Sequence, residues 1–63
     1  MLERLDAPAY VIDLQRAVVL LGNREFRAAF DGRRAEELAS YPAQEARFSL
    51  ADGRPVLLRI LTV

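Results

Sequence analysis

The sequence predicts an α+β fold with the element order β-β-α-α-β-β. Three observations lead to this prediction: two strand-forming runs near the N-terminus, an asparagine placed to start a helix, and an Asp-Gly turn between two later strands. We expect a four-stranded sheet, antiparallel or mixed, with the short helices on one face. The 63 residues leave room for a single domain, 1–63, with a thin margin of stability.

The first two strands are predicted at Ala9–Leu14 and Ala17–Leu21, where β-branched and other apolar residues gather. The polar break between them is short, so the two strands form an antiparallel hairpin. The second strand is apolar at every position, which predicts burial on both faces. A chain this small cannot cover both faces of a sheet, so we expect a partner surface. Before Pro8, residues 2–7 are predicted to form one helical turn.

Two short helices are predicted next. Asn23 is placed to cap the first, because its side-chain oxygen can accept a bond from an unpaired helical N–H. Phe26 and Phe30 follow at i, i+4 spacing and form an aromatic face. Gly32 ends this helix, since glycine tolerates the left-handed conformation found at helix C-termini. A second helix is predicted over residues 34–40.

The last part of the chain predicts a hairpin. Residues 45–50 alternate between polar and apolar side chains, the pattern of a half-buried strand. Asp52 and Gly53 are the predicted turn, because both central residues of a type I′ turn need positive φ. A two-residue turn places Phe48 opposite Leu57, whereas a longer loop shifts this register and exchanges the faces.

The final strand is predicted over Pro55–Val63. An edge left open at Val63 would be a site for strand addition.

Composition excludes several functions. The chain has no Cys and no His, which removes thiolate and imidazole ligands and the commonest general base. Nine Arg balance nine Asp and Glu, so no basic stripe favours nucleic acid. No apolar run approaches the roughly 20 residues that cross a bilayer, and residues 1–6 lack the apolar segment of a signal peptide. We expect a cytoplasmic protein.

The residues that could carry catalysis are few. Ser40, Ser49 and Thr62 have no His or Lys to activate them. Glu36 and Glu37 are adjacent, so on a helix their carboxylates diverge. We therefore expect no enzyme, no catalytic residues, no metal site and no cofactor.

The aromatic residues leave two interpretations open. They could line a pocket for a small apolar ligand, or fill the core, which is the more frequent outcome in so small a domain. The set consists of Tyr10, Phe26, Phe30, Tyr41 and Phe48.

At this point the chain resembles the PAS domain family. The run Tyr10–Asp13, then residues 18–23 and Phe26, is similar to the opening of a PAS domain, where two hairpin strands lead into an Asn-started helix. Phe30-Asp31-Gly32 followed by Glu36-Glu37-Leu38 is similar to the family's next step. Residues 45–60 are similar to one of its later hairpins. The resemblance implies a sensory or signal-relay fold. If the last strand, Pro55–Val63, takes the place of the family's final strand, the resemblance implies that it lies parallel to Ala9–Leu14, in the strand order 2-1-4-3; a swapped dimer is the alternative.

The chain also departs from the family pattern. Ser40-Tyr41-Pro42 leads directly into a strand, so the family's long helix and one of its last three strands are absent. Ligands of the family lie between that helix and the sheet. The resemblance therefore implies a dimerisation or signal-relay platform, partnered by a second copy or a neighbouring signalling domain. The expected interface residues are Val19, Leu21, Leu58 and Ile60.

Two alternative functions remain open. One is a small-molecule sensor that holds an apolar ligand against Phe26, Phe30 and Phe48. The other is a truncated relic without independent activity. In all three readings Asn23, Gly32, Asp52 and Gly53 are expected to have structural roles.

Overall fold

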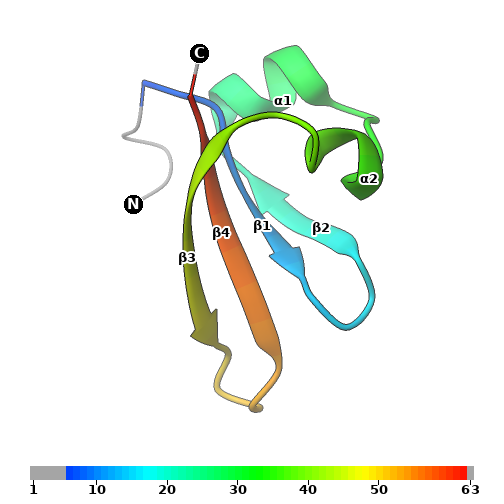
Figure 1. Ribbon diagram of the computed structural model, residues 1–63, viewed down its shortest axis with the longest axis vertical. Helices are drawn as coiled ribbons and strands as arrows, with labels where there is room; N and C mark the ends of the chain where they lie inside the picture. The colour runs from blue at the N-terminus through cyan, green and yellow to red at the C-terminus, as the bar shows by residue number, and fades with distance from the viewer. Residues whose placement is uncertain (1–5, 63) are drawn as a thin grey trace.

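The structure is a computed structural model that describes residues 6–62. It contains a four-stranded antiparallel sheet and two short helices, an α+β arrangement (Figure 1). In chain order the elements are β1 (Ala9–Asp13), β2 (Val18–Gly22), α1 (Arg24–Phe30), α2 (Ala35–Leu38), β3 (Ala43–Ser49) and β4 (Pro55–Leu61). The helical turn expected over residues 2–7 lies almost entirely outside the described residues.

The strand order in the sheet is β2-β1-β4-β3. β4 lies beside β1, but the expected parallel pairing is wrong, because the two strands run antiparallel. The reason is topological. Both helices lie at the end of the sheet where β2 finishes, so β3 starts from that same end and β4 returns to it (Figure 1). The edge expected at Val63 lies outside the described residues; within them, β4 is flanked by β1 and β3.

The β3–β4 hairpin has a three-residue loop instead of a two-residue turn. The N–H of Leu50 donates to the carbonyl of Arg54 at 3.0 Å, and the N–H of Gly53 donates back to the Leu50 carbonyl at 2.8 Å. Gly53 has φ +86°, the left-handed residue that closes such a loop. The extra loop residue shifts the register by one position. Phe48 therefore lies opposite Val56 and not opposite Leu57.

Helix α1 begins at Asn23, whose side chain accepts a hydrogen bond from the N–H of Phe26 at 2.9 Å. The residue before this cap approaches the helix closely. A Cβ built on Gly22 would lie 2.3 Å from the Phe26 ring, so only glycine fits there. After the helix, Gly32 adopts φ +82° and turns the chain towards α2. α2 is one turn long, shorter than the helix expected over 34–40.

The sheet has two distinct faces, which follow from the alternation of side chains along each strand. We call the face that the helices cover the inner face. Its core consists of Tyr10, Phe26, Leu38 and Leu61, with Ile12, Val19, Phe30, Tyr41 and Ala43 packed against it. The opposite, outer face carries Val11 of β1, Leu21 of β2, Leu58 and Ile60 of β4, and Gln44, Ala46 and Phe48 of β3.

Strand β2 differs most from its expected burial. It forms one edge of the sheet, and Val18, Leu20 and Leu21 are 51%, 41% and 52% exposed. The prediction that this apolar strand is buried on both faces is therefore wrong. A β-bulge interrupts its pairing with β1 between Val11 and Ile12. An edge strand with an apolar sequence leaves its side chains open to solvent or to another protein.

Candidate functional site

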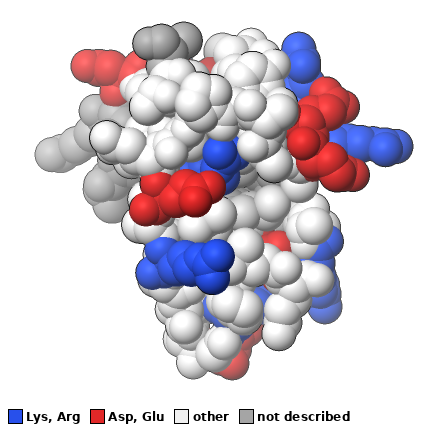
Figure 2. All heavy atoms as spheres, in the orientation of Figure 1, with Lys and Arg blue, Asp and Glu red and all other residues white. Residues whose placement is uncertain are grey.

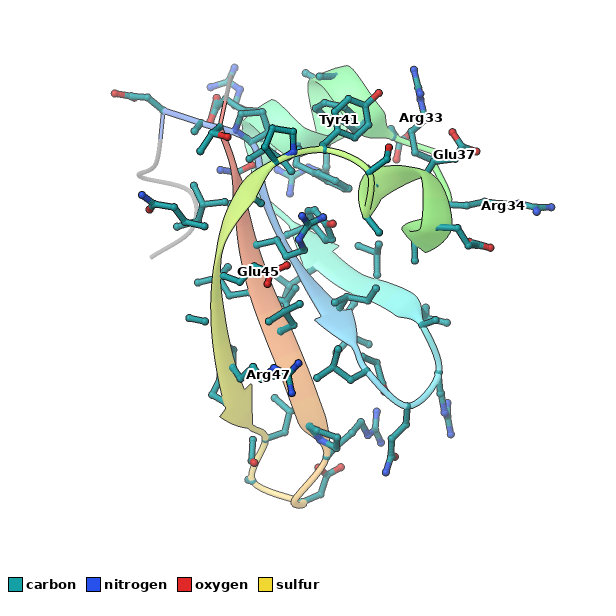
Figure 3. All side chains as sticks on the ribbon, in the orientation of Figure 1. Arg33, Arg34, Glu37, Tyr41, Glu45 and Arg47 are labelled. Carbon is teal, nitrogen blue, oxygen red and sulfur yellow. The ribbon has the colours of Figure 1, made fainter. Side chains whose placement is uncertain are left out.

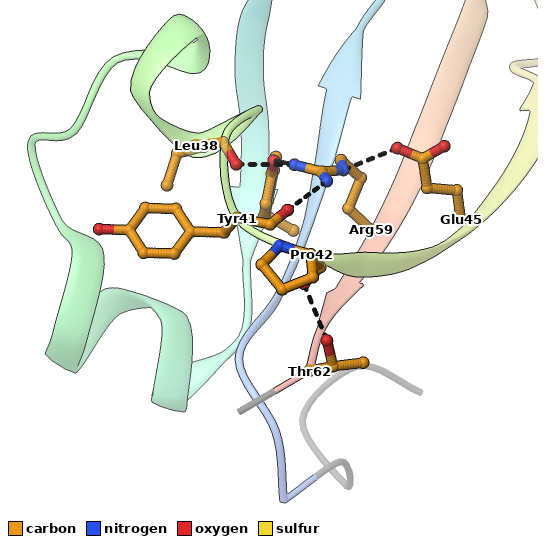
Figure 4. A network of polar contacts seen from close by, with 7 residues as sticks. Leu38, Tyr41, Pro42, Glu45, Arg59 and Thr62 are labelled. Carbon is orange, nitrogen blue, oxygen red and sulfur yellow. Dashed lines mark hydrogen bonds and ion pairs between the residues drawn. The ribbon is translucent and has the colours of Figure 1, made fainter.

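Arg59 is the centre of the polar network between the helices and the sheet (Figure 4). Its side chain is 7% exposed. Nη1 donates to the Tyr10 hydroxyl at 2.7 Å and to the Leu38 carbonyl at 2.8 Å. Nη2 donates to the Tyr41 carbonyl at 2.7 Å, and Nε donates to Oε2 of Glu45 at 2.9 Å. One guanidinium thus joins strands β1, β3 and β4 to the end of α2.

These contacts decide what Arg59 can do chemically. A guanidinium has five N–H donors, and four of them already make hydrogen bonds within the protein. A buried charge is tolerated only when it is paired and hydrogen-bonded, and both conditions are met here. The group therefore fixes the segment between α2 and β3 on the inner face, and it is not presented to an external anion.

Arg59 is a lone charge within the apolar last strand, and it was not singled out from the sequence. A usable signal was present, because a lone charge at the centre of an apolar strand must be paired wherever that strand is buried on both faces. What the sequence could not supply was the set of partners. Three of them, Tyr10, Leu38 and Tyr41, lie between 18 and 49 residues away along the chain.

Asn23 makes a second fixed junction. Besides capping α1, its Oδ1 accepts a hydrogen bond from the N–H of Ala9 at 3.0 Å, and its Nδ2 donates to the carbonyl of Ala7 at 2.8 Å. The side chain is completely buried. It therefore ties the start of β1 to the start of α1, a role beyond the capping predicted from the sequence. Gly32 and Gly53 occupy the positive-φ positions described above, and Oδ1 of Asp52 accepts from the N–H of Arg54 at 3.0 Å.

Asp13 is a buried acid at the far end of the sheet from the helices. Its Oδ1 accepts hydrogen bonds from the N–H groups of Gln15 at 2.9 Å and Arg16 at 3.1 Å. Its Oδ2 lies 3.5 Å from Nη1 of Arg54 and has no hydrogen bond among the described residues. The carboxylate organises the β1–β2 loop, and Arg54 joins it to Asp52, whose Oδ2 lies 3.3 Å from Nη2 of Arg54.

The three phenylalanines expected to face a ligand are not brought together. Phe26 and Phe30 stack in the core at 5.9 Å between ring centroids, and Tyr10 and Tyr41 pack against them. Phe48 lies on the outer face and is 45% exposed. The shift in hairpin register is the physical reason, since it moved every β3 side chain to the other face.

The expected interface residues are divided in the same way. Leu21, Leu58 and Ile60 lie on the outer face, whereas Val19 packs against the core on the inner face. The central row of the outer face runs across all four strands without a charge, through Ala46, Leu58, Val11 and Leu21. Beside it is a shallow hollow of about 140 Å³ that Gln44, Glu45, Ala46, Leu58 and Ile60 line.

Strand β3 carries charged side chains on its inner side. Glu45 and Arg47 both point towards the inner face (Figure 3), because Phe48 and Ala46 point away from it. The space-filling view of this face shows an acidic and a basic patch, one below the other, apart from the charged cluster at the right-hand edge (Figure 2). Glu45 is paired with Arg59. Within residues 6–62, Arg47 makes no ion pair.

In comparison with known proteins, no family model matches the chain, and neither the curated proteins nor the solved structures provide a match. Neither helix among the described residues is long and apolar enough to cross a membrane. Residues 6–62 contain no group of three or more acidic side chains that could hold a metal ion.

Proposed function

We propose that this chain is a PAS-like interaction module that acts as a dimerisation or signal-relay platform and has no enzymatic activity. The observation that carries the proposal is the largely apolar outer face of the sheet, whose central row of Ala46, Leu58, Val11 and Leu21 has no charge. Leu21 and Phe48 are 52% and 45% exposed on it, and the described part of the chain places no helix over it. Exposed apolar surface of this kind marks a contact site for another protein.

The inner face supports the same proposal, because it leaves no room for a bound ligand. Arg59 and the aromatic cluster occupy the space between the helices and the sheet. A sensor of the proposed alternative type needs an apolar cavity against Phe26 and Phe30, and these rings instead stack on each other. The relay platform needs no such cavity, so the uncovered face rather than the interior carries the function.

A second copy of the chain is the occupant that fits the β3 side of the outer face best. Phe48 projects from β3 beside the hollow between β3 and β4. One copy therefore carries both a large exposed apolar side chain and an apolar hollow. A two-fold contact requires one surface to be complementary to itself. Contacts of stable dimers are enriched in aromatic residues and depleted in charge at their centre. Exposed Phe48 and the central row of the outer face have these two properties.

Sedimentation equilibrium on the full chain tests the proposal. We expect a dimer at about 50 μM, with Phe48→Glu shifting it to monomer because two charges would be buried per contact. Leu20→Glu is the matched control, since Leu20 is 41% exposed but lies on β2 at the opposite edge of the sheet. A wild-type chain that is monomeric at this concentration would refute the proposal. Dissociation by Leu20→Glu alone would move the contact to β2.

A further inference from the structure

Within residues 6–62, β3 is one of the two edge strands of the sheet, and part of its backbone is left unpaired by β4. The N–H of Leu50 bonds the carbonyl of Arg54, and the N–H of Thr62 bonds the carbonyl of Pro42. In an antiparallel ladder the bonding direction alternates from residue to residue. The even-numbered residues of β3 therefore bond to β4, and Ala43, Glu45, Arg47 and Ser49 turn their N–H and C=O groups outward.

This edge is better suited to strand addition than the other one. β3 is seven residues long, contains no proline and pairs with β4 in unbroken register. β2 is five residues long and carries a bulge. Bulges and short edge strands are the devices by which proteins prevent edge-to-edge pairing. β3 has neither device, and its two charged residues are of opposite sign.

We propose that two copies of the chain pair antiparallel through β3, with the two-fold axis at Ala46, so that Glu45 opposes the partner's Arg47. The inference rests on the proposed function, because it specifies how the dimer forms. In this register every outward-facing residue meets another outward-facing residue, as backbone pairing requires. Both charged residues are then satisfied, and Arg47 gains the ion pair that it lacks within residues 6–62.

The charges select this register from its neighbours. A two-fold axis at Glu45 would place the two Glu45 side chains opposite each other, and an axis at Arg47 would do the same to the two arginines. Like charges directly opposed across strands are destabilising. Axes at Gln44 or Phe48 shorten the overlap and leave the charges opposite neutral residues. Glu45 can serve both arginines, since a carboxylate has two oxygens and only Oε2 contacts Arg59.

The outer side of the same register uses the apolar surface. Ala46 meets the partner's Ala46 at the axis, where the small side chains let the two sheets join closely. Gln44 meets the partner's Phe48, so each Phe48 lies against the wall of the partner's hollow that Gln44 and Ala46 form. The uncharged row of each copy then continues into the other across an eight-stranded sheet.

Cysteine cross-linking tests the register directly, because the chain has no native cysteine. Residues at a non-hydrogen-bonded antiparallel pair lie about 4.5 Å apart between Cα atoms, a distance that a disulfide spans. Ala46→Cys should oxidise to a covalent dimer. Gln44→Cys should not, because the two copies of residue 44 would lie about 14 Å apart. A mixture of Gln44→Cys and Phe48→Cys chains should give the heterodimer.

Charge reversal gives an independent test without altering the core. Arg47→Glu should weaken the dimer roughly tenfold or more, since it places two acids opposite each other twice per dimer. Arg34→Glu is the control, because Arg34 is exposed and points away from the sheet (Figure 3). Two results together would overturn the register and leave the proposed function standing. The dimer would be as stable with Arg47→Glu as without it, and the Ala46→Cys variant would form a covalent dimer no faster than the Gln44→Cys variant. A monomeric wild type would refute both.

Discussion

Tyr10 and Arg59 face each other directly across β1 and β4 and make two contacts. The hydroxyl accepts a hydrogen bond from Nη1 at 2.7 Å, and the guanidinium carbon lies 5.8 Å from the ring centroid. The same guanidinium also binds two carbonyls of the segment that leads from α2 to β3. A pair of cross-strand neighbours therefore decides where the helical half of the chain rests on the sheet.

Arg59→Met should largely unfold the protein. Removing the guanidinium leaves the Tyr10 hydroxyl and the carbonyls of Leu38 and Tyr41 without their donor, at about 1–3 kcal/mol for each buried group left unsatisfied. Together these costs approach the whole stability of a domain this small. Tyr10→Phe removes one hydrogen bond and should cost only about 1 kcal/mol. Urea denaturation followed by circular dichroism measures both. Equal effects of the two substitutions would show that the carbonyl contacts contribute little.

Asn23 should tolerate neither shortening nor charge. Asn23→Ala loses the cap of α1 and the bond to Ala9, and we expect a cost of about 2 kcal/mol or more. Asn23→Asp keeps the accepting oxygen but loses the donor to the Ala7 carbonyl, so its cost should be smaller than that of the alanine variant. Thermal unfolding of the three proteins gives the ranking. If Asn23→Asp were the worse of the two, burial of its charge would outweigh capping.

Gly22→Ala should destabilise the protein through packing. The added Cβ would lie 2.3 Å from the Phe26 ring, and relieving such an overlap typically costs about 1–3 kcal/mol. Phe26→Leu in the same chain should recover part of that loss, because the smaller side chain gives way. A double-mutant cycle in urea measures the coupling. Strict additivity of the two substitutions would contradict the steric explanation.

Ala17→Gly should stabilise the protein. Ala17 has φ +55° at the end of the β1–β2 loop, where its N–H donates to the Asp13 carbonyl at 2.8 Å. An L-residue in this region costs roughly 1 kcal/mol, and glycine avoids the cost. Because glycine also gains freedom in the unfolded chain, the net gain should be a few tenths of a kcal/mol. A lower urea midpoint for Ala17→Gly would contradict this expectation.

Local signals predicted the α+β class and the positions of its elements well. Asn23 caps a helix, and both hairpins occur where polar or Asp-Gly breaks were found. Each of these features is determined by residues close together in the sequence. The direction of β4 against β1 was missed because it depends on how the chain returns from the helices, which no local pattern records.

The candidate site could be predicted only in part. Leu21, Leu58 and Ile60 share the outer face, but Val19 and Phe48 lie on faces other than those expected. For Phe48 the reason is the loop, since an Asp-Gly pair is compatible with two or three loop residues. For Arg59 the reason is distance in sequence. A buried charge indicates that it has hydrogen-bond partners, but the sequence does not indicate which residues these partners are.

The three-residue loop after β3 has a consequence for insertions and deletions. Alternation along a strand has a period of two, so the loop length, and no residue within β3, determines which of its side chains meet the helices. Deleting Ala51 would turn Phe48 towards the helices and take Glu45 away from Arg59. The ion pair between Glu45 and Arg59 can therefore form only with the present loop length. Substitutions in this hairpin should be far better tolerated than any change in its number of residues.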